Sequence, residues 1–159
     1  MKKNNIVYAG FFDPFTLGHF DVVLRATEFF DEVVVAVAKE SPKVSLFSFS
    51  ERFELVQEIF KNQKKVRVDS FEGLLINYMK KNQDKVLLRG LRTVSDFEYE
   101  FQMAQANKTL DRTIETFFIM TDAKYSYLSS TLIREIGRLG GDVSQMVPKE
   151  VANKMRDKK

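Results

Sequence analysis

Short runs of apolar, β-branched residues alternate with longer stretches of helical periodicity along the whole chain of 159 residues. The run 33–38 is apolar at every position, as expected of a strand that is covered on both faces. Strands that alternate with helices through short links predict a parallel sheet with helices on both faces. We therefore expect an α/β fold with strands at 6–9, 33–38, 66–69, 86–88 and 116–120, and helices at 19–30, 49–61, 73–81, 95–108, 130–139 and 148–156.

Residues at the expected helix ends support these boundaries. Ser48 and Glu51 have the spacing of a capping box ahead of one helix. The glycine pair 140–141 closes the next-to-last helix, and Pro148 suits the first turn of the last one. No internal repeat, low-complexity segment or linker interrupts the pattern, so residues 1–159 are expected to form a single domain.

The composition excludes several kinds of site. The chain has no cysteine and one histidine, which excludes disulfides, thiolate metal sites and multi-histidine metal sites. No apolar run has the length of a membrane span, and the start of the chain leads into a predicted strand rather than a signal peptide. We expect a cytoplasmic protein without a membrane partner.

The formal net charge of +3 is concentrated at one end of the chain. Residues 154–159 carry four basic side chains and one acidic one, which accounts for the whole excess. A nucleic-acid-binding protein usually presents a basic face across its fold, so no nucleic-acid partner is expected. A solvated terminal tail is the favoured interpretation of these cations.

Ligands of open parallel sheets bind beyond the carboxyl ends of the strands. This rule places most of the polar and glycine-containing segments on one rim of the expected sheet. The segments are 10–19, 39–48, 71–75, 89–95 and 123–131.

The segment 10–19 reads as the end of a strand, a tight loop and the start of a helix. A helix N-terminus attracts phosphate through unpaired backbone N–H groups and a partial positive charge. Gly10 and Gly18 allow close approach of the backbone to a ligand, and Thr16 has the position of a helix cap. His19 can add a donor, although a lone histidine is more often structural, and Asp13 suits a turn as well as a chemical role.

Two further segments carry candidate phosphate ligands. Arg89 and Arg92 flank a glycine after a predicted strand and can fork onto two phosphates, the alternative being ordinary surface arginines. Ser95 and Asp96 have the pattern of a helix cap and a first-turn acid. Glu100 is either a ribose contact or a solvated side chain.

The segment 125–131 offers hydroxyls at a helix start and tyrosines that could face an adenine. At least one of these hydroxyls is expected to be a cap, and the others could donate to phosphate. Lys43 is distinguished only by its position on the rim. Phe97, Phe101 and Met103 could line a subunit interface or the core.

Three blocks resemble bacterial phosphopantetheine adenylyltransferases: Gly-x-Phe-Asp-Pro-x-Thr-x-Gly-His at 10–19, Arg-Gly-Leu-Arg-x-x-x-Asp-Phe-Glu-Tyr-Glu at 89–100, and Ser-Ser-Thr at 129–131. The similarity extends from about residue 6 to 151, and the middle block is the one that points to this member of the nucleotidyltransferases. The resemblance implies a Rossmann-like fold, transfer of an adenylyl group from ATP to 4′-phosphopantetheine, a Mg²⁺ requirement and a homohexamer.

Site roles follow from the resemblance position by position. His19 would stabilise the transition state, and a helix N-terminus is expected to lower its pKa so that it acts as a neutral donor. The residues implied to bind phosphopantetheine are Phe11, Lys43, Leu75 and Arg89. The residues implied to bind ATP are Phe11, Phe12, His19, Gly90, Leu91, Arg92, Glu100, Tyr125, Ser126, Tyr127, Leu128, Ser129, Ser130 and Thr131.

The chain departs from the family pattern at Phe11, where members commonly carry a threonine whose hydroxyl reaches the phosphates, and more mildly at Ala9, commonly proline. The alternatives are an adenylyltransferase acting on nicotinate or nicotinamide mononucleotide, and a nucleotide-binding regulator without catalysis. A class I aminoacyl-tRNA synthetase would need a longer chain and a basic RNA-binding surface.

Overall fold

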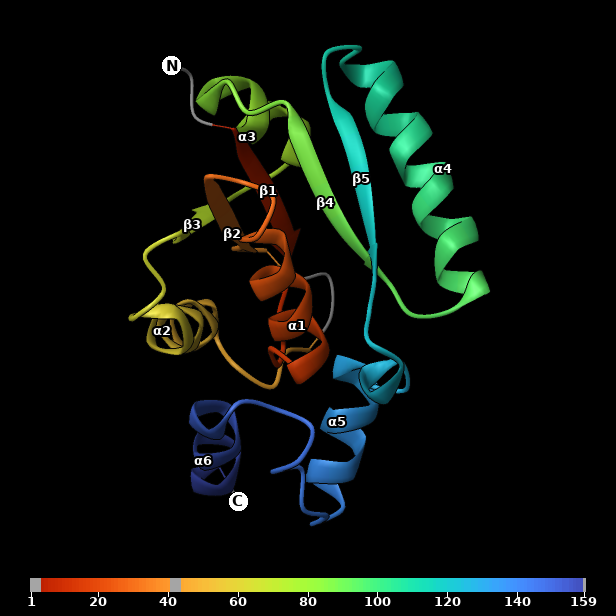
Figure 1. The fold of residues 1–159 in the computed structure, drawn as a ribbon. Helices are drawn as coiled ribbons and strands as arrows, with labels where there is room; N and C mark the ends of the chain where they lie inside the picture. Colours follow the sequence, from red (N-terminus) through yellow and green to blue (C-terminus); the bar gives the residue numbers. More distant parts are fainter. Residues whose placement is uncertain (1–3, 41–43, 159) are drawn as a thin grey trace.

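The structure is a computed structural model that describes residues 4–40 and 44–158. Strands and helices alternate as expected, and two helices end the chain (Figure 1). The strands are β1 (Asn5–Gly10), β2 (Glu32–Ala38), β3 (Val66–Phe71), β4 (Val86–Leu91) and β5 (Glu115–Met120). The helices are α1 (Leu17–Ala26), α2 (Phe49–Phe60), α3 (Leu75–Asn82), α4 (Val94–Leu110), α5 (Ser130–Arg138) and α6 (Lys149–Asp157), with a 3₁₀ turn, η1 (Ala123–Tyr125).

The five strands form one parallel sheet in the order β3-β2-β1-β4-β5. The chain first adds strands on one side of β1 and then returns to add β4 and β5 on its other side. Such a reversal of winding direction creates a crevice at the carboxyl ends of the two strands concerned, here β1 and β4. The strand β1 pairs with β4 at Val7 with Leu87 and at Tyr8 with Leu88, whereas it stays paired with β2 as far as Gly10.

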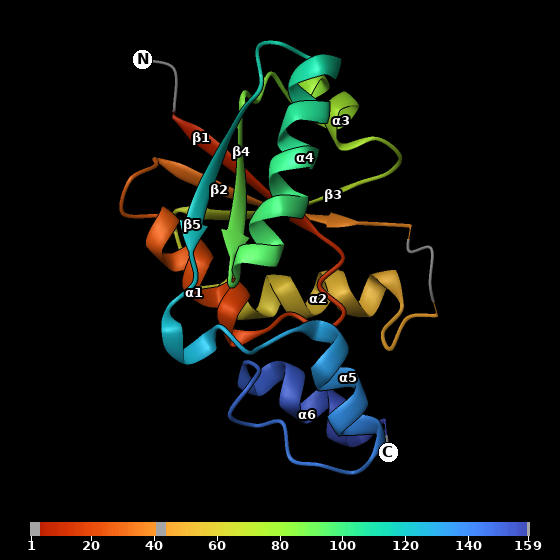
Figure 2. The same ribbon diagram turned by 90° about the vertical axis from the view of Figure 1, so that its right-hand side faces the viewer.

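Helices cover both faces of the sheet, as predicted (Figure 2). The larger core cluster joins alternate residues of β1 and β2 to the apolar faces of α1, α2, α5 and α6. The smaller cluster lies on the opposite face under α3, around Val34, Ile76 and Met79. The strand β2 is buried from Val33 onward, which confirms the prediction of a strand covered on both sides.

Element boundaries differ from the predictions at several helix starts. The first helix begins at Leu17 rather than His19, because Thr16 is its cap. Thr93, not Ser95, caps α4 by accepting a hydrogen bond from the backbone of Asp96. The strand β4 extends to Leu91, so Arg89 lies within a strand rather than after it. The capping box at Ser48 and Glu51 is confirmed.

The lysines of the predicted basic tail that the structure describes are partly exposed and also form ion pairs. The ammonium groups of Lys154 and Lys158 lie 3.6 and 2.8 Å from the carboxylate of Glu51 on α2. Lys158 also donates to the carbonyl of Leu46 at 3.1 Å. The hydrogen bond from Lys158, followed by that from the backbone N–H of Ser48, lowers the pKa of Glu51 to about 2, and the charge of Lys154 adds a smaller effect. The helix α6 is therefore fastened to the start of α2.

No helix in the described ranges combines the length and apolarity needed to cross a membrane.

Candidate active site

A cavity of about 550 Å³ opens where β1 and β4 separate. Its wall combines the end of β1, the start of α1, the end of β4 and the start of α5. The predicted site residues that line it are Phe11, Phe12, His19, Arg89, Gly90, Arg92, Glu100, Leu128, Ser129, Ser130 and Thr131. The cavity therefore lies on the rim that the strand order predicts.

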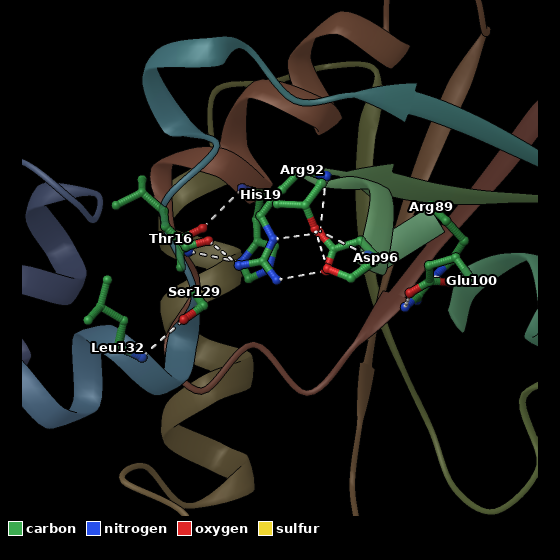
Figure 3. Close-up of polar contacts among 11 residues, drawn as sticks. Thr16, His19, Arg89, Arg92, Asp96, Glu100, Ser129 and Leu132 are labelled. Atoms are coloured by element: carbon green, nitrogen blue, oxygen red, sulfur yellow. Dashed lines mark hydrogen bonds and ion pairs between the residues drawn. The ribbon is translucent and has the colours of Figure 1, made fainter. Parts of the chain in front are cut away.

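His19 is held by a reciprocal capping box with Thr16 (Figure 3). The hydroxyl of Thr16 accepts from the backbone N–H of His19 at 3.1 Å, and the backbone N–H of Thr16 donates to Nδ1 of His19 at 3.0 Å. Because Nδ1 accepts a hydrogen bond, the neutral ring carries its proton on Nε2. The imidazole is thus fixed in one tautomer before any ligand binds.

Electrostatics keep this imidazole neutral. Burial, followed by the positive charges of Arg92 and Arg89, lowers the pKa of His19 from its usual 6.5 to about 3. The predicted direction of the shift is confirmed, but its cause is burial and two guanidinium groups rather than the helix N-terminus. A neutral donor at Nε2 is what remains at physiological pH.

Aromatic rings enclose His19 on one side of the cavity. The rings of Phe12 and Phe15 each lie 5.2 Å from the imidazole, and that of Tyr8 lies 6.2 Å away, between centroids. We call Tyr8, Phe12 and His19 the aromatic wall. Burial raises the pKa of Tyr8, so its hydroxyl stays protonated beside the cavity.

The backbone at Phe12 has an unusual conformation that brings its ring inward. Its φ is +54°, in the left-handed region that non-glycine residues rarely adopt. The ring packs over Gly10, where a Cβ atom would lie only 3.0 Å from two of its carbons. Gly10 is therefore needed for packing of the aromatic wall, in addition to the predicted approach of a ligand.

Arg89 and Glu100 form a forked ion pair on the other side of the cavity (Figure 3). Both Nε and Nη2 of Arg89 donate to Glu100 at 2.7 Å, and Nη1 donates to the carbonyl of Ala9 at 2.9 Å. The last bond spans the gap between β4 and β1. Glu100 is buried, so the prediction of a solvated side chain is wrong.

Arg92 forms a second ion pair, with Asp96 in the first turn of α4. Its Nε and Nη2 donate to Asp96 at 3.0 and 3.2 Å, and its Nη1 donates to the carbonyl of Leu128 in the segment before α5. We call Arg89, Arg92, Asp96 and Glu100 the charged wall. Each guanidinium has five N–H donors, and the contacts found among the described residues use three, which leaves two for a phosphate.

The Ser-Ser-Thr block has mixed roles. Ser129 caps α5 by accepting from Leu132 at 3.1 Å, as expected of one hydroxyl, and Ser130 donates to the carbonyl of Pro14 at 2.8 Å. Thr131 accepts from Arg134 at 3.2 Å. These contacts tie the start of α5 to the loop that precedes His19.

Several predicted ligands do not lie on the cavity wall. Lys43 is outside the described residues. Leu91 is buried in the sheet, and Leu75 packs against the smaller core cluster. The residues outside the wall are Leu75, Leu91, Tyr125, Ser126 and Tyr127. Residues 125–127 form the end of the 3₁₀ turn η1 and the residues that follow it. This short turn was not predicted from the sequence.

Other residues of the wall were not predicted, namely Tyr8, Thr121 and Arg134. In the sequence, Tyr8 is recognisable only as part of the apolar strand predicted at 6–9. Thr121 follows β5 directly and lies two residues before the rim segment 123–131, so a segment that began at the end of the strand would have included it. Arg134 looks like a surface residue of a helix, yet its guanidinium donates to the carbonyl of Asp13.

The fold and the site are those of a nucleotidyltransferase, and residues 7–136 match the model of the cytidylyltransferase-like family. Curated relatives are more specific. Over 152 residues the chain is 51% identical to the phosphopantetheine adenylyltransferase of Solidesulfovibrio magneticus, covering 96% of this chain and 88% of the relative. Identity to the enzyme of that name from Syntrophus aciditrophicus is 49% over 156 residues, covering 98% and 94%. The chain belongs to the phosphopantetheine adenylyltransferase family.

A solved structure confirms the fold. The chain superposes with a TM-score of 0.73 on a Vibrio parahaemolyticus protein proposed to be a nicotinate-nucleotide adenylyltransferase, covering 97% of this chain and 99% of that one. At 17% sequence identity this likeness concerns the fold alone.

Proposed function

We propose that the protein transfers the adenylyl group of ATP to 4′-phosphopantetheine, giving dephospho-coenzyme A and pyrophosphate. The observation that carries the proposal is a neutral histidine donor facing two arginines across one cavity, in a chain whose relatives at 44 to 51% identity bear this activity in their names. The alternative acceptor, nicotinate or nicotinamide mononucleotide, has only the fold likeness behind it.

The chemistry requires positioning more than acid–base groups. The acceptor phosphate is largely ionised near neutral pH and attacks the α-phosphate of ATP in line, so neither a general base nor a covalent intermediate is needed. Nε2–H of His19 would donate to an α-phosphate oxygen as negative charge accumulates there. A donor fixed in advance of the reaction contributes roughly 3–4 kcal/mol to the transition state.

The two substrates are assigned to opposite sides of the cavity. Phosphopantetheine is placed near Phe11 and Arg89, with Lys43 and Leu75 as further predicted contacts. ATP is placed along Gly90, Arg92 and the start of α5. This arrangement brings both anions to the charged wall, with His19 between them.

Mg²⁺ is part of the proposal as an ion that arrives with the nucleotide. Among the described residues, no group of three or more histidine, cysteine, aspartate or glutamate side chains has the geometry of a metal site. The acids nearest the cavity already accept hydrogen bonds, Asp13 from backbone amides and Asp96 and Glu100 from arginines. These residues do not form a metal cage, which suits an ion held by phosphates and water.

A homohexamer in the cytoplasm completes the proposal. The helix α4 supports association because Phe97, Phe101 and Met103 are 45, 47 and 41% exposed, which makes the core interpretation of these residues wrong. A group of large apolar side chains exposed together on a protein surface marks an association site. Light scattering should give the mass of six chains, and Phe97→Ser with Phe101→Ser should lower it.

Turnover tests the function directly. Release of pyrophosphate from ATP should require 4′-phosphopantetheine and should fall at least about 100-fold in His19→Ala. Nicotinamide mononucleotide, offered at the same concentration, should support less than about 1% of that rate, because discrimination between acceptors with different polar groups is strong. Preference for the mononucleotide would reject the proposed acceptor, and binding without turnover would favour a regulator.

A further inference from the structure

Arg52 on α2 is a buried arginine whose hydrogen bonds go to main-chain carbonyls. Its side chain is 2% exposed. Nη1 donates to the carbonyls of Phe11 and Ala38 at 2.7 and 2.8 Å, and Nη2 donates to that of Lys39 at 3.3 Å. Among the described residues it forms no ion pair, and its Nε has no hydrogen-bond partner. A buried charge held in this way is costly and is seldom found without a role.

The three carbonyls lie just beyond β1 and at the end of β2, at the edge of the sheet where the cavity opens. Phe11 lines that cavity, and the next residue, Phe12, has a left-handed backbone. By bonding to Phe11 and to residues 38–39 together, Arg52 holds the turn after β1 against the end of β2. The proposed function does not use this contact.

Asp13 supplies a second buried charge in the same place. It is 8% exposed, and its two carboxylate oxygens accept from the backbone N–H groups of Leu46 and Phe47 at 2.8 and 2.9 Å. Burial lowers the pKa of Arg52, and the negative charge of Asp13 raises it, so the two charges are close enough to stabilise each other. The loop 10–13 is thus bonded to residues 38–39 through Arg52 and to residues 46–47 through Asp13.

We propose that Arg52 and Asp13 are positioning residues for the phosphorylated acceptor, because they anchor the loop 10–13, which lines the acceptor side of the cavity, to the segments 38–39 and 46–47. This inference rests on the proposed function. The loop 10–13 follows β1, whereas the ATP contacts proposed at Gly90, at Arg92 and at the start of α5 lie on the opposite side. Loss of either charge should therefore affect the acceptor far more than the nucleotide.

Steady-state kinetics with each substrate varied in turn tests the proposal. Arg52→Met should raise the KM for phosphopantetheine about 10- to 100-fold, since small misplacements of binding groups have effects of this size. Arg52→Lys keeps the charge but cannot donate to three carbonyls at once. Its KM for phosphopantetheine should therefore lie between those of the natural protein and Arg52→Met. Asp13→Asn keeps the volume but turns a donor toward a backbone N–H, and it should raise the same KM. The KM for ATP should stay within about twofold throughout, because the side chains of Arg52 and Asp13 make no hydrogen bond to β4 or α5 among the described residues.

Arg67→Met is the matched control. Arg67 lies on β3 with its side chain 42% exposed and pairs with Glu32 and Asp69. Its loss should leave both KM values at the natural level.

Three results would overturn the inference: equal rises in both KM values, a lower kcat with unchanged KM values, or a natural KM for phosphopantetheine in Arg52→Lys. Should Arg52→Met fail to fold, Arg52→Lys and Asp13→Asn decide the matter. A natural protein without turnover on these substrates would instead reject the proposed function, and the inference with it.

Discussion

The two walls of the cavity are held in place by different forces. The aromatic wall depends on ring packing and on a local capping box, none of which carries a net charge. The charged wall depends on two arginine–carboxylate pairs, one from β4 to α4 and one from the residue after β4 to the first turn of α4. The first is therefore rigid and insensitive to salt, whereas the second has to share its donors with an arriving phosphate. Catalysis and substrate binding are expected to divide along the same line.

The largest expected effect comes from the aromatic wall. His19→Ala should lower kcat about 10²- to 10³-fold with small changes in both KM values, because the donor acts mainly in the transition state. Pyrophosphate release under saturating substrates measures it. His19→Gln keeps an amide donor and should recover part of the rate. A tenfold or greater rise in either KM with unchanged kcat would place His19 in binding instead.

A change in the charged wall should act on binding. Arg89→Met should raise the KM for phosphopantetheine about 10- to 100-fold, since a hydrogen bond to a charged group contributes roughly 1.5–3 kcal/mol. Arg112→Met removes an exposed arginine outside the cavity wall and is the control. Identical kinetics of the two variants would show that Arg89 does not contact the acceptor.

The pairing within the charged wall can be tested through stability. Glu100→Gln should lower the free energy of unfolding by about 1–3 kcal/mol, because Arg89 loses a carboxylate partner. Urea titration measures the loss, and phosphopantetheine should restore part of it by supplying an anion. Glu98→Gln, on an exposed position of the same helix, should have no effect. Unchanged stability with a raised KM for ATP would support the ribose contact predicted from the sequence.

The pH dependence of the aromatic wall follows from the lowered pKa of His19. Because the chain has one histidine, nitrogen NMR reports its imidazole without ambiguity, and the Nε2–H tautomer should persist from pH 8 to 5. In the unfolded chain this ring takes up a proton near pH 6.5, so folding stability should fall as the pH decreases from 7 to 5. His19→Asn should show a smaller fall. Protonation of the folded ring near pH 6.5 would contradict the structure.

The smallest effect is expected at Phe11. Its ring is 42% exposed at the cavity, and its carbonyl, not its side chain, is bonded to Arg52. Phe11→Thr supplies the hydroxyl common in the family, so turnover should equal or exceed that of the natural protein. A large decrease would show that the ring has a role in binding.

Much of the fold could be predicted because its signals are local. The apolar strand 33–38 and the box at Ser48 and Glu51 depend on residues close together in the chain. The position of the candidate site could also be predicted, because the carboxyl ends of parallel strands meet at one edge of a sheet and each strand end is visible in the local sequence. His19 and the two arginines were found in this way.

Contacts between distant segments could not be predicted. The buried Arg52 occupies a helix position that looks ordinary in the sequence, and its partners are 13 to 41 residues away. Glu100 was open to two interpretations because its partner, Arg89, lies on another element. The role of Lys158 at Glu51 was missed for the same reason.

The bond between Lys158 and Glu51 has a consequence for the order in which the protein becomes complete on the ribosome. Glu51 emerges early, whereas Lys158 follows only after β3, β4 and β5 have been made. Until then the start of α2 and the carbonyl of Leu46 lack their cation, and Phe47, which packs under the same lysine, is less well covered. Nascent chains halted before α6 should therefore acquire the sheet before the start of α2 acquires its ion pair.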